Sequence, residues 1–189
     1  MGIQDDLAGH SASKHSSNIQ SYQRFKFEVV KLEYGTKNTG KFFIAEFEVL
    51  ESAKTAEIDP IASEYYKKEI KVEVNPVGSR PAARIKFTGN KNDMGPANTL
   101  AFLGALVGED SDAFWASPKG QSLMVEAVGP EQPYEGYPIA GESYTILTKE
   151  KKTPFTIINW IHVPQSIEEK KFLAQAKAER LKAAKIASK

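Results

Sequence analysis

Apolar and polar side chains alternate along several segments of the chain, a pattern typical of half-buried β-strands. Two such segments, 25–30 and 41–50, flank a turn-rich stretch at 35–40. In the second segment one apolar phase is formed by Phe43, Ala45, Phe47 and Val49. The pattern predicts a β-hairpin with one face in the core.

The same alternation predicts strands at 70–74, 82–88, 123–127, 144–148 and 155–163. Leucines at helical spacing after Gly95-Pro96 predict a helix over 96–107 that ends at Gly108. Asp59-Pro60 predicts a short helix, and a second short turn is expected at 112–115.

Ser166 followed by Glu169 matches a capping box, so a helix is expected from there to the end of the chain. This helix is basic: Lys170 to Lys189 contains seven basic residues and one acidic residue. Three roles are open for it. It docks on the main domain through Leu173, Ala176 and Ala184, it extends a nucleic-acid footprint, or it mediates self-association.

Composition limits the classes of protein to consider. The chain has 189 residues, with 25 basic and 24 acidic ones, so any attraction to a polyanion must come from local clustering. It has no cysteine, which excludes disulfides and thiolate chemistry. The N-terminus lacks the pattern of a signal peptide and no apolar run spans a bilayer, so we expect no membrane contact and a cytoplasmic location, the host cytoplasm if the protein is viral.

Motifs for catalysis or metal binding are weak. The stretch Gly35 to Lys41 matches the start of a phosphate-binding loop, but Phe42 stands where Ser or Thr should bind magnesium. The three histidines have no metal-site spacing, and no nucleophile motif accompanies them. We therefore expect no enzyme activity, no cofactor, no metal and no catalytic residue.

Basic and aromatic residues form the remaining candidate site. Arg84 and Lys86 lie on one face of the predicted 82–88 strand, and Phe42 lies on the outward phase of the 41–50 strand. Cations beside exposed rings are what single-stranded nucleic acid needs, because rings stack on bases while cations bind phosphates. The candidate nucleic-acid-binding residues are Tyr34, Lys37, Lys41, Phe42, Arg80, Arg84, Lys86, Lys91, Lys149, Lys151, Lys152 and Trp160.

The order of the elements predicts the fold. Strands, a helix at 96–107 and then further strands follow the order of an OB-fold, a five-stranded Greek-key barrel with a helix between strands 3 and 4. The expected fold class is mainly β, with a basic C-terminal α-helix added. The expected parts are a flexible arm at 1–21, an OB-fold-like domain at 22–164 and the basic helix at 165–189.

The chain from about Arg24 to Val163 resembles bacteriophage OB-fold proteins of the single-stranded DNA-binding type. The resemblance lies in FKFEVVKLEYGTKNTGKFFIAEFEVLES, NPVGSRPAARIKF, TLAFLGALVG and GQSLMVEAV. It implies that nucleic acid crosses strands 2 and 3 and the adjoining loops. Many such proteins end in an acidic tail, whereas this chain ends in a basic helix.

Two functions follow as expectations. The first is sequence-independent binding of single-stranded DNA in phage replication or recombination, with self-association or replication proteins engaged through the C-terminal helix. The sequence does not separate DNA from RNA. The alternative is a phage structural or assembly module that binds protein partners or itself without nucleic acid.

Overall fold

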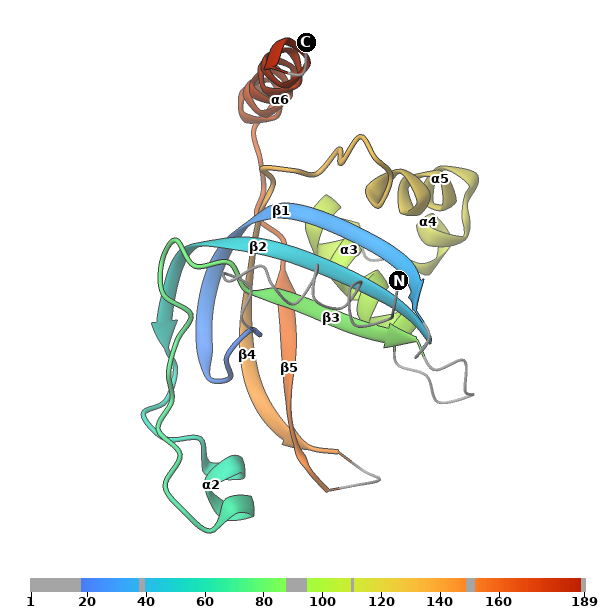
Figure 1. Ribbon diagram of the computed structural model, residues 1–189. Coiled ribbons are helices and arrows are strands. Elements are labelled where there is room, and N and C mark those ends of the chain that lie inside the picture. The colour runs from blue at the N-terminus through green and yellow to red at the C-terminus, as the bar shows by residue number, and fades with distance from the viewer. Residues whose placement is uncertain (1–17, 38–39, 88–94, 110, 149–151, 188–189) are drawn as a thin grey trace, which may run out of the picture.

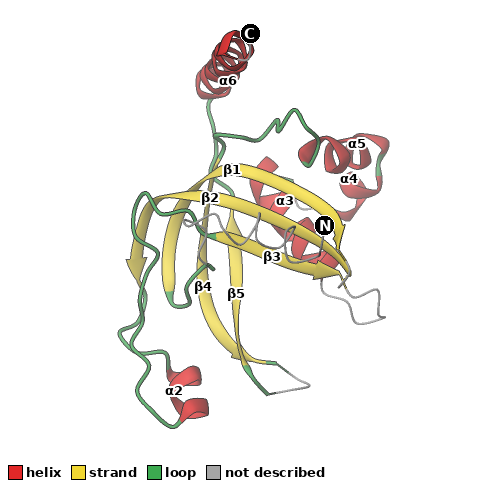
Figure 2. Cartoon of the chain, viewed as in Figure 1, coloured by secondary structure: helices red, strands yellow, loops and turns green. Residues whose placement is uncertain are grey.

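The computed structural model describes residues 18–37, 40–87, 95–109, 111–148 and 152–187, and the description below covers these residues. They form five strands and five helices, and because the strands make one sheet that carries most of the core, the protein is mainly β (Figure 2). The strands are β1 (Gln23–Lys37), β2 (Gly40–Lys54), β3 (Ala82–Phe87), β4 (Pro138–Leu147) and β5 (Pro154–Ile161). The helices are α2 (Pro60–Tyr66), α3 (Gly95–Val107), α4 (Asp112–Ala116), α5 (Pro118–Ala127) and α6 (Ile167–Ala187).

The strands form one antiparallel sheet in the order β3-β2-β1-β4-β5. β1 and β2 form the predicted hairpin, and both curve strongly (Figure 1). β1 pairs with β2 along its length, but it pairs with β4 only from Arg24 to Glu28. Register shifts near Phe27 and Lys31 accompany the bend, as β-bulges do.

The second half of β1 therefore has an edge that β4 does not cover. The side-chain amide of Gln132 takes the place of a strand there. Its Oε1 accepts a hydrogen bond from the backbone N–H of Leu32 at 2.7 Å, and its Nε2 donates to the Leu32 carbonyl at 2.8 Å. This pair holds the segment after α5 against β1.

The predicted alternation produces the core. Phe43, Ala45, Phe47 and Val49 are all buried, as expected for one face of β2. Phe102 from α3 packs on this face, with its ring centroid 5.5 Å from that of Phe43 and 5.9 Å from that of Phe47. The helix at 96–107 is thus confirmed. It ends at Gly108, whose φ of +77° is a left-handed conformation that glycine adopts without strain.

Residues 18–21, expected in the flexible arm, lie against the sheet instead. Ile19 is buried at 6 % exposure, and Asn18 forms a parallel bridge with Ala82 of β3. Ser21 Oγ lies 2.5 Å from Thr156 Oγ1 of β5. The segment therefore contacts both end strands of the sheet, β3 and β5. Burial of its large apolar side chain, Ile19, stabilises this placement. The expected arm at 1–17 lies outside the described residues.

A buried polar pair ties this segment to the connection between α2 and β3. Gln23 and Asn75 are almost fully buried, and their side chains lie 2.6 Å apart at Nε2 and Oδ1. Gln23 Oε1 also accepts from the backbone N–H of Asn75, and Asn75 Oδ1 accepts from the backbone N–H of Gln20. These bonds satisfy groups that would be costly to bury alone.

Two predicted strands are wrong. Segment 70–74 forms only an isolated bridge, Lys71 with Ile58, because among the described residues only the short 57–59 stretch pairs with it. Segment 123–127 belongs to α5: Ser117 caps the helix by accepting from the Gly120 N–H, and Pro118 occupies its first turn. The inward positions 120, 123, 124 and 127 have helical spacing, which the i, i+2 pattern of Leu, Val and Ala had obscured.

Other boundaries shift. β1 and β2 extend into the expected 35–40 turn, and β4 begins at Pro138, before the start of the strand expected at 144–148. The short helix α2 begins after Asp59 as predicted, and Asp59 Oδ1 accepts from the Ala62 N–H. The capping box of α6 is also confirmed, with Ser166 N–H donating to Glu169 Oε2 at 2.7 Å and Glu169 N–H donating to Ser166 Oγ at 3.1 Å.

Candidate nucleic-acid interface

The outer face of β1, β2 and β3 brings three of the predicted residues together. In β2, Phe42 pairs with Lys86 of β3 on one side and with Gly35 of β1 on the other. The next row joins Ile44 to Arg84. Directly paired residues point to the same face of a sheet, so Phe42, Arg84 and Lys86 share one surface.

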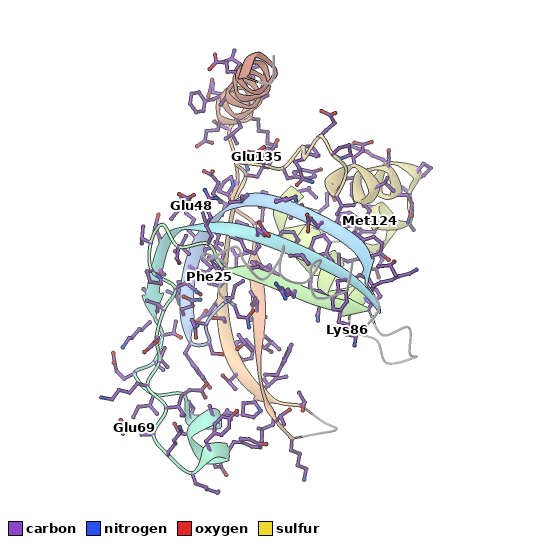
Figure 3. The ribbon with its side chains drawn as sticks, viewed as in Figure 1. Phe25, Glu48, Glu69, Lys86, Met124 and Glu135 are labelled. Atoms are coloured by element: carbon purple, nitrogen blue, oxygen red, sulfur yellow. The ribbon has the colours of Figure 1, made fainter. Side chains whose placement is uncertain are left out.

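Two acidic side chains on the same face are engaged by other cations, and a third, Glu46, is in register with Lys31. Glu33 forms an ion pair with Lys31, and Glu48 forms one with Arg80 at 3.3 Å. Glu48 and Lys86 lie toward opposite ends of the sheet (Figure 3). Within the part of the chain that the structure describes, no ion pair engages Arg84 or Lys86. Both are exposed, so their charges are presented to solvent.

A groove of about 390 Å³ runs along this face beside the edge of β1. Phe42 and Ile44 of β2 line this groove, and so does the 128–132 segment, with Pro130. Gly35 lies between them, and a Cβ atom built there would meet nothing within 4 Å. The Phe42 ring is half-buried and borders this open space. The groove therefore lies beside an aromatic ring of β2, and Lys86 lies on the neighbouring strand β3.

Tyr34 and Lys41 lie on the opposite phase of the sheet. Tyr34 pairs with Phe43, and its ring is 48 % exposed and packs edge-on against Phe87 at 5.5 Å. Lys41 pairs with Phe87 and is exposed at the start of β2. These two residues are therefore not part of the outer row of Phe42.

Trp160 does not lie on the outer face. Its half-buried ring packs among core rings, with centroids 5.0 Å from Phe102, 5.5 Å from Phe47 and 5.8 Å from Phe25. The expectation of an exposed Trp160 ring for base stacking is wrong, because β5 turns this position toward the aromatic core.

The lysines near the turns are only partly described. Lys152 is exposed after the β4–β5 turn, and its φ is +47°. Lys91, Lys149 and Lys151 lie outside the described residues, as does the side chain of Lys37.

Sequence reasoning missed the groove and three other exposed rings. Tyr65 and Tyr66 on α2 are 43 % and 55 % exposed, and Phe155 on β5 is 54 % exposed. The outward phase of the 155–163 strand is a signal that could have found Phe155. Nothing local indicates that Pro130 lines the same groove as Phe42, because the two are 88 positions apart and are brought there only by the path of the chain.

The titratable groups that shift move away from neutral pH. Burial raises the pKa of Tyr22 and raises the pKa of Tyr134 to about 12. A side-chain hydrogen bond with Glu33 raises the pKa of Lys31. Such shifts make these groups poorer proton donors or acceptors near neutrality. Among the described residues, no cluster of three metal-binding side chains occurs.

Comparison with protein-family models, with curated proteins and with solved structures found no match. No helix within the described ranges is both long and apolar enough to cross a membrane.

Proposed function

We propose that this protein binds single-stranded DNA without sequence preference and acts in phage DNA replication or recombination. One observation carries the proposal. The Phe42 ring borders the open groove over Gly35, while Lys86 and Arg84 lie on the adjoining strand without an acidic partner among the described residues. A base stacked in the groove would place its phosphates near these cations.

The strand order supports the same proposal. β1 pairs with both β2 and β4, and α3 lies between β3 and β4 along the chain. We infer an OB-fold-like arrangement, in which residues 18–21 contribute between the two end strands. Proteins with this fold commonly bind oligonucleotides on the face of strands 2 and 3, which is where Phe42 and Lys86 lie.

The mechanism proposed is stacking together with backbone neutralisation. Aromatic stacking is tolerant of sequence because every base has a π-face, and the cations contact phosphates, which carry no sequence information. The mixed charge of the outer face, where Glu33 and Glu48 are neutralised by ion pairs, gives a modest field. We therefore expect moderate affinity that falls as salt rises.

The test is fluorescence anisotropy of a labelled oligo-dT of about 30 nucleotides, titrated at low and near-physiological salt with duplex DNA as competitor. We expect Arg84→Ala with Lys86→Ala to weaken binding about tenfold at low salt. The slope of log affinity against log salt should become shallower by about 1.4, because each single-strand phosphate contact contributes about 0.7.

Lys71→Ala with Lys119→Ala is the matched control, since it removes the same charge from exposed positions away from the outer face. The control should bind like the wild type. Equal losses in both double variants would show that only net charge matters, and absence of binding at low salt would overturn the proposed function.

A further inference from the structure

Charge is unevenly distributed along a chain whose net charge is only +1. Residues 109–135, which include α4 and α5, contain six acidic residues and one basic residue. Residues 170–189, most of α6, contain seven basic residues and one acidic residue. Two segments of opposite charge are thus carried by helices outside the sheet.

The basic helix α6 projects away from the rest of the molecule and lies apart from α4 and α5 (Figure 1). In the N-terminal part of α6, Leu173 is half-buried and lies close to Gly136, where an added Cβ would be 3.2 Å from Leu173 Cδ2. Ile167 and Phe172 remain 73 % and 68 % exposed. Tertiary packing supplies most of the stability of a helix in a protein, and the described side chains at the start of α6 are mostly exposed, so a partner surface would stabilise this helix.

The other segment carries exposed acidic side chains on α4, α5 and the residues that flank them. On α5, Val125 is 73 % exposed and Glu126 beside it is exposed, and Asp112 on α4 is exposed as well. Glu109 and Glu131, both exposed, flank these helices. We name these five residues the acidic surface. It combines negative charge with one large exposed apolar side chain, which complements a basic helix that exposes Ile167 and Phe172.

We propose that α6 of one copy docks on the acidic surface of a second copy of this chain. If each copy provides its helix to the other, the exchange closes a two-fold dimer. Charge complementarity favours a second copy as the partner. Nucleic acid would leave Ile167 and Phe172 exposed, whereas the acidic surface offers Val125 as an apolar contact.

The first measurement is sedimentation velocity of the full chain without nucleic acid, at about 50 mM and about 500 mM salt. We expect a concentration-dependent dimer at low salt and a weaker one at high salt, since exposed charge pairs are screened. A monomer at all protein concentrations at low salt would overturn the proposal.

Two charge reversals then test the surfaces. Glu126→Lys with Glu131→Lys should weaken dimerisation about tenfold, and so should Lys170→Glu with Lys171→Glu. Acidic residues are favourable near a helix N-terminus, so the second variant should keep α6 helical. Mixing the two variants should restore a dimer, because each reversed surface then meets an oppositely charged one.

Glu64→Lys with Glu69→Lys is the control, because both acids are exposed and neither belongs to the acidic surface. This variant should dimerise like the wild type. A dimer unaffected by either reversal, or a mixture that fails to associate, would overturn the proposal. So would a loss of oligonucleotide binding by Lys170→Glu with Lys171→Glu while dimerisation is unchanged. Because no nucleic acid is present in the association measurements, their failure is separate from failure of the proposed function.

Discussion

At the residue scale, Gly35 matters for the candidate site because it has no side chain. It pairs with Phe42, and a Cβ there would meet nothing within 4 Å, so the groove beside the ring stays open. Sequence periodicity placed Phe42 and Ile44 on the outward phase, and the structure confirms that phase. The same reasoning gave Gly35 to a turn, so it did not reveal the groove.

Replacing this glycine tests whether a base occupies the groove. Gly35→Leu should fill the space without disturbing the fold, because Gly35 is not in a left-handed conformation and has open space around it. We expect oligonucleotide affinity to fall about tenfold, the loss of roughly one stacking contact. Anisotropy with the same labelled oligo-dT measures it.

Ala113→Leu adds similar bulk to an exposed position of α4 and serves as the control. Circular dichroism and the urea midpoint establish that both variants are folded. Unchanged affinity in folded Gly35→Leu would mean that the groove does not receive a base.

At the element scale, the ends of helices follow more directly from the sequence than the type and length of strands do. The caps at Asp59 and Ser166 and the stop at Gly108 are satisfied by residues within a few positions, so they are visible locally. The prediction of a strand at 123–127 is wrong because the spacing of apolar residues in so short a segment fits one face of a helix equally well. Packing on the core decided for α5.

The capping box of α6 predicts a pH dependence. Hydrogen bonding from the Ser166 backbone lowers the pKa of Glu169 below its ordinary value of 4.5. Because the folded pKa is lower than the unfolded one, the cap contributes its full stability above pH 4.5 and loses it as pH falls through the folded pKa. The Ser166 amide resonance, followed by NMR, should titrate with a midpoint below 4.5.

Glu169→Gln keeps a side-chain oxygen acceptor but cannot ionise, so the low-pH step of the Ser166 amide should disappear in this variant. A Ser166 midpoint at or above the ordinary glutamate value, or the same step in both proteins, would contradict this account of the cap.

At the scale of the whole molecule, residues 18–21 contact both β3 and β5, the two ends of the sheet. Ile19 is their buried apolar contribution. Ile19→Ala should lower the free energy of unfolding by about 2–4 kcal/mol, from lost burial and the cavity left behind. Urea denaturation measures the change.

Val77→Ala is the matched control, since Val77 is 67 % exposed and its truncation should change the free energy of unfolding by less than about 0.5 kcal/mol. A similarly small effect for Ile19→Ala would mean that the N-terminal segment does not help to hold the sheet together.

The sequence by itself determined a mainly β protein with the β1–β2 hairpin, a core-facing helix after Gly95 and a capped C-terminal helix. These features follow from local spacing of apolar residues and from capping groups close in sequence. The outward phase of Phe42, Arg84 and Lys86 has the same origin, because alternation along a strand fixes its two faces.

Tertiary structure decided the rest, through contacts between residues distant in sequence. It brought Pro130 to the same groove as Phe42, turned Trp160 toward the aromatic core and placed Ile19 in the hydrophobic core. It also left 70–74 with only an isolated bridge, to Ile58, among the described residues. In each case the outcome depends on which surfaces meet when the chain folds, and no local pattern carries that information.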